Sequence, residues 1–324
     1  MGINIEAFNM VNKAIRWVVF SFLCLTGIFF YAMTTLQAWP HPIAWVPALL
    51  LAVLILSIVI EVRDTNQDIF SKNKFREAAI SMVFHALGAL STFVLSHELN
   101  FGAVVASAAV GLLGNLIFME KEVEIYSGSF VGMCSLLVAQ SYLVLGLSAL
   151  LAGLLFYLSK SSLAGLGGKL GLISLAAVVI VGLMLGGNLP ALSDTLPGFS
   201  FLLILMTAVS TPATIQLARF KGFGTVRASA LVSLAAGLLL PVVFPENGRA
   251  FAAAVMSASF AGMSSRDRIP GMAWAALAGL LSGVVFEFSS GIFNGIGGKL
   301  GTIAFGASLI VFGLSTIFPV PARE

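Results

Sequence analysis

The stretch Ser-Gly-Ser-Phe-Val-Gly-Met-Cys-Ser at residues 127–135 decides how the chain is organised. It recurs 130 residues later as Ser-Ala-Ser-Phe-Ala-Gly-Met-Ser-Ser at residues 257–265, with six of nine positions identical. At the same offset, Gly-Leu-Gly-Gly-Lys-Leu-Gly-Leu-Ile at 165–173 matches Gly-Ile-Gly-Gly-Lys-Leu-Gly-Thr-Ile at 295–303, with seven of nine identical. Two separate blocks that agree at one spacing predict an internal duplication.

The composition is that of a membrane protein. Hydrophobic residues make up 59% of the chain and charged residues 10%, which excludes an ordinary soluble domain. A membrane-spanning helix needs about 20 apolar residues, and the sequence predicts an all-α polytopic protein of about 12 spans. Several segments are short, so that one or two of them could be re-entrant. The segments are roughly 15–36, 43–62, 78–96, 101–118, 125–141, 142–159, 171–188, 199–218, 227–245, 249–265, 271–289 and 301–318.

The distribution of basic residues predicts the orientation. With the N-terminus inside and twelve alternating spans, only Arg249 and Lys299 of the 17 Lys and Arg residues fall outside. Basic residues favour the cytoplasmic side. We therefore expect a protein integral to the cytoplasmic (inner) membrane with both termini in the cytoplasm.

One repeat carries five spans, and an odd number of crossings inverts the second copy relative to the first. The expected organisation is an N-terminal two-helix segment with a cytoplasmic loop (1–77), repeat 1 (78–188), a connector with the start of the eighth span (189–207), and repeat 2 (208–318). Two inverted five-helix repeats preceded by two extra helices resemble, in architecture, several transporters and the urea- or ammonium-type channels. That resemblance implies a site near the bilayer midplane, between the repeats.

The repeated serine and glycine motif is the candidate substrate site. Glycine and serine let a membrane helix break, so that backbone groups and hydroxyls face a polar cavity, and Phe130 and Phe260 would form paired apolar gates. The alternative is close helix packing through the small-xxx-small spacing. A kink at Pro212 would add hydroxyls to the site. The candidate substrate-binding residues are Ser127, Ser129, Phe130, Gly132, Ser135, Ser257, Ser259, Phe260, Gly262, Ser264, Thr211 and Thr214.

Four ionisable residues are further candidates. His85 and Glu287 lie within apolar spans, where an ionisable group marks a site of proton coupling, although a neutral histidine bonded to a neighbouring backbone fits equally well. Lys169 and Lys299 follow paired glycines at expected helix starts, which would attract anions at a vestibule on each face. A tight turn with a snorkelling lysine is the alternative.

These observations predict a transport protein for a small polar or anionic solute. The alternatives are a selective channel of urea- or ammonium-type architecture, a non-transporting membrane subunit, and a lipid-handling membrane enzyme. Enzymatic activity is not expected, because the chain has no HExxH motif, no His/Asp cluster at metal-ligand spacing and no Ser/His/Asp set. We expect no cofactor, no metal and no nucleic-acid partner. The expected partners are the solute or ion and the lipid bilayer, with a homo-oligomer left open.

Overall fold

The chain folds entirely into helices where its structure is described. A computed structural model describes residues 5–39, 41–64, 74–185 and 200–319, and it contains twelve α-helices within these ranges. Residues 65–73 of the predicted cytoplasmic loop and 186–199 of the predicted connector lie outside the described residues. The helices are α1 (Ile5–Ala38), α2 (Trp45–Asp64), α3 (Lys74–Phe93), α4 (Ala103–Ile117), α5 (Glu122–Val131), α6 (Tyr142–Leu158), α7 (Lys169–Met184), α8 (Phe201–Ala218), α9 (Thr225–Val243), α10 (Gly248–Ala261), α11 (Met272–Phe288) and α12 (Lys299–Ile317). A π-helical turn (Val94–Glu98) extends α3, and a 3₁₀ turn (Met119–Lys121) precedes α5.

Length and composition are compatible with an integral membrane protein. Within the described residues, six helical segments are long and apolar enough to cross a bilayer, and four further apolar helices are shorter. The prediction of an all-helical chain is confirmed. The number of spans stays a prediction. The six long segments are Lys13–Ala38, Trp45–Val62, Phe75–Glu98, Phe201–Ala218, Thr225–Val243 and Lys299–Ile317.

The helices α5 and α10 are shorter than the sequence predicts. They contain 10 and 14 residues, which at about 1.5 Å per residue gives lengths of about 15 and 21 Å, against about 30 Å for the hydrocarbon core. Of the predicted segment 125–141, the residues after Val131 lie outside α5, and of the predicted segment 249–265 only the last four residues lie outside α10. The chain leaves the helix there because its backbone bonds elsewhere: the Ser135 N–H donates to the Gly295 carbonyl and the Ser265 N–H to the Gly165 carbonyl, both at 2.8 Å.

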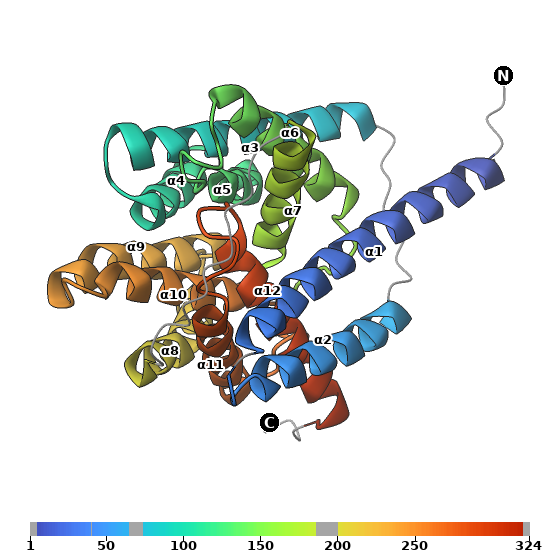
Figure 1. Cartoon of the computed structure of the whole chain (residues 1–324). Helices are drawn as coiled ribbons and strands as arrows, with labels where there is room; N and C mark the ends of the chain where they lie inside the picture. The colour runs from blue at the N-terminus through green and yellow to red at the C-terminus, as the bar shows by residue number, and fades with distance from the viewer. Residues whose placement is uncertain (1–4, 40, 65–73, 186–199, 320–324) are drawn as a thin grey trace.

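These two bonds belong to a set of matched contacts at the 130-residue offset. The Gly167 N–H donates to Ser264 Oγ at 2.9 Å, and the Gly297 N–H donates to Cys134 Sγ at 3.2 Å. The turn after α5 therefore bonds to the turn before α12, and the turn after α10 bonds to the turn before α7. Figure 1 shows α7 and α12 side by side in the middle of the molecule.

Glycines allow the first turns of α7 and α12 to touch. Gly168 and Gly298 precede these helices with φ of +81° and +89°, a region that favours glycine. A Cβ on Gly171 would overlap Gly301, and a Cβ on Gly301 would overlap Gly171. Equivalent residues of the two sequence copies are thus in direct contact.

The helices α4 and α9 of the two copies match at a second offset, 122 residues. Phe-Gly-Ala-Val-Val-Ala-Ser-Ala at 101–108 corresponds to Phe-Gly-Thr-Val-Arg-Ala-Ser-Ala at 223–230. Gly102 and Gly224, both with φ of +76°, precede α4 and α9. The offset changes from 122 to 130 because α9 and α10 (19 and 14 residues) are each longer than α4 and α5 (15 and 10 residues).

The N-terminal helices α1 and α2 pack against α12. The Tyr31 hydroxyl donates to the Ile303 carbonyl at 3.1 Å, Gly306 lies against the Tyr31 ring, and Gly313 lies against Ser57. Figure 1 shows the α1–α2 pair along one side of the bundle.

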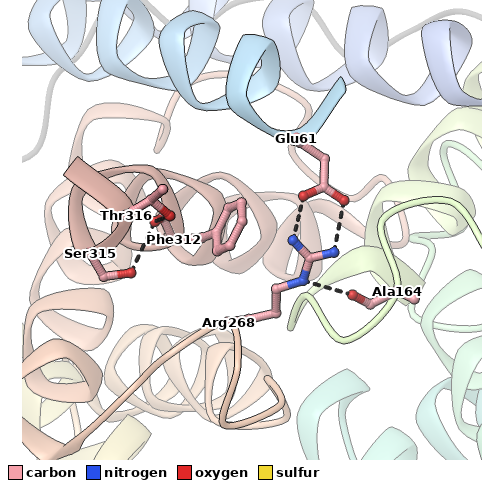
Figure 2. A network of polar contacts seen from close by, with 6 residues as sticks. All are labelled: Glu61, Ala164, Arg268, Phe312, Ser315 and Thr316. Atoms are coloured by element: carbon pink, nitrogen blue, oxygen red, sulfur yellow. Dashed lines mark hydrogen bonds and ion pairs between the residues drawn. The ribbon is translucent and has the colours of Figure 1, made fainter. Parts of the chain in front are cut away.

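A buried ion pair joins α2 to the turn after α10 (Figure 2). The Arg268 guanidinium binds both carboxylate oxygens of Glu61, with Nη2 at 2.9 Å from Oε1. Its Nε–H donates to the Ala164 carbonyl at 3.1 Å, and its Cζ lies 4.5 Å from the Phe312 ring centroid. Glu61 is only 2% exposed, so this pair fixes how the N-terminal helices dock.

Candidate functional site

Three aromatic side chains fill the space where α5 and α10 end. The ring centroids of Phe130 and Phe260 are 4.5 Å apart, and Tyr126 lies 4.7 Å from Phe130 and 6.0 Å from Phe260. All three side chains are buried. Because Phe130 and Phe260 are equivalent residues in contact, they lie where an axis relating the two copies would pass.

Buried hydroxyls lie beside these rings, with the same arrangement in each copy. Ser129 Oγ donates to the Tyr126 carbonyl at 2.6 Å and bonds to Ser107 Oγ at 2.8 Å. Ser259 Oγ donates to the Met256 carbonyl at 2.7 Å and bonds to Ser229 Oγ at 2.9 Å. Ser107 and Ser229 are equivalent at the 122-residue offset, whereas Ser129 and Ser259 are equivalent at 130.

Two further bonds make the hydroxyl cluster asymmetric. Ser233 Oγ also bonds to Ser259 Oγ, at 3.0 Å, and the Tyr126 hydroxyl lies 3.2 Å from Ser229 Oγ. Tyr126 on α5 thereby reaches from the first copy into the second. Its equivalent, the buried Met256, has no hydroxyl with which to do the same.

The remaining serines of the motif lie away from this cluster. Ser257 Oγ donates to the Leu300 carbonyl at 2.7 Å, while the buried Ser127 hydroxyl has no hydrogen-bond partner within the described ranges. Ser135 and Ser264 belong to the crossed turns described above. The structure brings Ser129 and Ser259 to the aromatic centre and leaves the other candidate serines around it.

The predicted small-xxx-small packing is present. A Cβ on Gly132 would overlap the Ala89 carbonyl of α3, and a Cβ on Gly262 would lie 2.6 Å from Thr214 Cβ on α8. Thr211 Oγ1 donates to the Ala258 carbonyl at 2.7 Å, and Thr214 Oγ1 donates to the Ser210 carbonyl at 2.9 Å. These contacts give both glycines and both threonines a packing role, and their role in binding stays a prediction.

The candidate ionisable residues are buried away from the hydroxyl cluster. His85 Nδ1 lies 2.8 Å from the Ser81 carbonyl, while its Nε2 has no partner in the described chain. A carbonyl accepts only from a protonated nitrogen, so Nδ1 of His85 carries a proton. Glu287 Oε1 accepts the Ser200 N–H at 3.2 Å. Proton coupling by either residue stays a prediction.

The two lysines bind carbonyl oxygens at the ends of α6 and α11. Lys169 Nζ donates to the Ser159 carbonyl and, at 2.5 Å, to the Ser162 carbonyl. Lys299 Nζ donates to the Ser289 carbonyl at 2.7 Å and to Asn294 Oδ1 at 2.8 Å. Each ammonium thus satisfies carbonyls at a helix C-terminus. These contacts do not test the prediction that the two lysines attract anions at vestibules, which stays a prediction.

A groove of about 680 Å³ opens at one end of the antiparallel α4–α9 pair. It lies between the N-terminus of α4, the C-terminal part of α9 and the first turns of α10. Its lining residues are Ser96, Asn100, Phe101, Gly102, Ala103, Val104, Val105, Gly237, Leu238, Pro241, Arg249 and Ala252.

The opposite end of the same helix pair is filled by a hydrogen-bonded triad. Arg227 Nε donates to Asn115 Oδ1 at 2.6 Å, and Asn115 Nδ2 donates to Glu122 Oε2. We call Arg227, Asn115 and Glu122 the polar plug. At the two offsets their equivalents are Val105, Gly237 and Ala252, and all three line the groove. Equivalent positions therefore line a groove at one end and form a hydrogen-bonded triad at the other.

The described residues contain no group of three His, Cys, Asp or Glu side chains that could hold a metal ion. No model of a known protein family, no curated protein and no solved structure matches the chain. The candidate site therefore stands on its own geometry.

Sequence comparison at a single offset missed most of this arrangement. The hydroxyls of Ser107, Ser229, Ser233 and Tyr126, and the charged members of the polar plug, were not among the predicted site residues. A gapped comparison would have found the serines, because the blocks at 101–108 and 223–230 share six of eight residues.

Proposed function

We propose that the protein is an integral membrane transport protein that moves a small polar or anionic solute between two inverted five-helix halves. In this proposal α3–α7 and α8–α12 form the halves, α1 and α2 are the two extra helices, and about twelve segments cross the cytoplasmic membrane. The positive-inside bias would place both termini in the cytoplasm, the groove outside and the polar plug inside.

The meeting of α5 and α10 at Phe130 and Phe260 is the observation that carries the proposal. Broken helices at membrane depth are tolerated where they are buried in protein or line a cavity. In transporters built from inverted repeats, such helices form the solute site near the midplane. Here two equivalent helices end against each other, with hydroxyls from both copies beside the rings.

The two ends of the α4–α9 pair favour a carrier over a permanently open channel. A carrier exposes its site to one face at a time, and this pair has a groove at one end and a polar plug at the other. In this proposal, the aromatic centre separates the groove from the plug. Movement of Phe130 and Phe260 would connect the site to either face in turn.

Uptake by liposomes that contain the full chain tests the proposal. A panel of small polar and anionic solutes is screened with and without sodium and pH gradients. A carrier saturates and shows counterflow, whereas a channel shows no trans-stimulation. Uptake no faster than in empty liposomes for the whole panel would contradict transport and favour a non-transporting membrane subunit.

The serine pair at the aromatic centre provides the matched variants. We expect Ser129→Ala with Ser259→Ala to lower uptake at least tenfold, because the site loses two hydroxyls from its polar surface. The control is Ser148→Ala with Ser282→Ala, two equally buried serines on α6 and α11 whose hydroxyls each bond to a carbonyl of their own helix, at 2.8 and 2.9 Å. Equal uptake by the two double variants would remove the serine motif from the pathway.

A further inference from the structure

The groove has an uncapped helix N-terminus in its wall. Gly102 precedes α4 and makes no side-chain cap, and the first helical hydrogen bond is donated by Ala106 to the Gly102 carbonyl at 3.0 Å. The N–H groups of Ala103, Val104 and Val105 precede that bond, and these three residues line the groove. Free N–H groups at the start of a helix attract anions.

Ser96 supplies a second and independent feature of the same wall. This residue lines the groove and is only 7% exposed. A buried serine in a helix normally donates to a carbonyl of its own helix. The Ser96 hydroxyl has no hydrogen-bond partner in the parts of the chain that the structure describes, so a ligand in the groove would find it unpaired.

The opposite wall carries the positive charge. Arg249, in the first turn of α10, is the one charged residue among the described residues that line the groove. Its side chain is exposed, so its guanidinium is accessible to a ligand. The nearby Glu98 accepts a hydrogen bond from the Tyr142 hydroxyl at 3.1 Å and does not line the groove.

We propose that this groove binds an anion with a carboxylate or phosphate group, held by Arg249, the Ser96 hydroxyl and the free N–H groups of α4. Guanidinium donors match the two oxygens of such groups. The rest of the groove is lined by Val104, Leu238 and Pro241, which suits an apolar remainder of the ligand. The same chemistry is offered by a small organic solute and by the headgroup of an anionic lipid.

This inference deepens the proposed function, because it gives the transported solute a negative charge, but binding is measurable without flux. The test uses the full chain in nanodiscs of zwitterionic lipid, titrated calorimetrically with phosphate, acetate and benzoate at constant ionic strength. A parallel set of nanodiscs contains anionic phosphatidylglycerol, and the thermal stability of the protein is compared between the two lipids.

We expect Arg249→Gln and Ser96→Ala to weaken anion binding, the arginine variant about tenfold or more, since a charge-assisted hydrogen bond is lost. Arg266→Gln, which removes an exposed arginine outside the groove, is the matched control and should bind as the native chain does. If Arg249→Gln loses binding of a soluble anion and Arg266→Gln keeps it, the groove is a solute site. If Arg249→Gln loses the stabilisation by the anionic lipid and Arg266→Gln keeps it, the groove is a headgroup site. Absence of both effects, or equal effects in Arg249→Gln and Arg266→Gln, would overturn the proposal even if a neutral solute is transported.

Discussion

The two ends of the α4–α9 pair have equivalent backbones and different side chains. At the groove, the positions are Val105, Gly237 and Ala252. At the polar plug, the equivalents Arg227, Asn115 and Glu122 bond to one another. The apolar set has no polar group with which to close the groove, whereas the polar set closes its end through hydrogen bonds that water or a ligand could replace. Three pairs of residues thus distinguish the two ends, and we expect them to control access at each end.

The turns after α5 and α10 differ in a related way. Both bond to the opposite copy through equivalent serine N–H groups. Beyond these bonds, the turn after α10 carries Arg268, which binds Glu61 of α2, while its equivalent in the turn after α5 is the buried Val138. Only one of two equivalent turns is therefore tied to the N-terminal helices by a charge.

The largest expected effect comes from removing that charge. Arg268→Gln removes the ion pair that binds both oxygens of the buried Glu61 carboxylate, which costs about 3–5 kcal/mol of folding free energy. Arg266→Gln, two residues away and exposed, should change stability by no more than about 0.5 kcal/mol. Unfolding of both variants in mixed micelles measures the difference. Equal stabilities would show that the ion pair does not fix the docking of α1 and α2.

We expect access at the two ends to change when the side chains of the polar plug are introduced at the groove, and when those of the groove are introduced at the polar plug. Val105→Arg, Gly237→Asn and Ala252→Glu are introduced together, because a Cβ on Gly237 would lie 2.8 Å from Val105 Cγ2 and the side chains must repack as a set. We expect the triple variant to close the groove and to lower transport at least tenfold, since an added plug would have to break at each cycle.

Cysteine reporters at equivalent positions measure the exchange. Ala103→Cys reports on the groove and Thr225→Cys on the plugged end, and the native cysteines Cys24 and Cys134 are buried. In the otherwise native chain, where Ala103 is partly buried and Thr225 is exposed, the reaction of a water-soluble thiol reagent with Cys at position 103 gives the reference rate for the groove. The triple variant should slow that reaction, whereas Arg227→Val, Asn115→Gly and Glu122→Ala together should accelerate the reaction at position 225. Rates unchanged by both exchanges would show that these six residues do not control access.

The sequence predicts which segments repeat. It does not predict which residues, far apart in the chain, contact one another. The helical class follows from hydropathy, and two blocks at one offset predict the duplication. The end of α5 did not follow, because the residues beyond it stay apolar. Leu136 and Leu137 are 61% and 80% exposed, so a hydropathy pattern does not distinguish that turn from a continuing span.

Long-range partners were hidden for two physical reasons. The hydroxyl pairs Ser107–Ser129 and Ser229–Ser259 are equivalent, but the greater length of α9 and α10 separates them in an ungapped comparison. Glu61 and Arg268 lie 207 positions apart, and no repeat relates them, because α2 has no counterpart in the duplication. A salt bridge of this kind becomes visible only when the fold places both side chains together.

The smallest expected effect concerns the Tyr126 hydroxyl, which bonds from the first copy to Ser229 of the second. Tyr126→Phe removes the bond to Ser229 but keeps the ring against Phe130 and Phe260, so it should cost about 1 kcal/mol of stability. Its equivalent Met256 makes no such bond, and Met256→Leu, which conserves volume, should cost less than about 1.5 kcal/mol through packing alone.

A double-mutant cycle separates the loss of the hydrogen bond from the change in packing. The destabilisation by Tyr126→Phe and Ser229→Ala together should differ from the sum of the two single effects by a measurable interaction free energy. The effects of Met256→Leu and Ser107→Ala should add. Additivity in both cycles would show that the Tyr126 hydroxyl does not link the two halves.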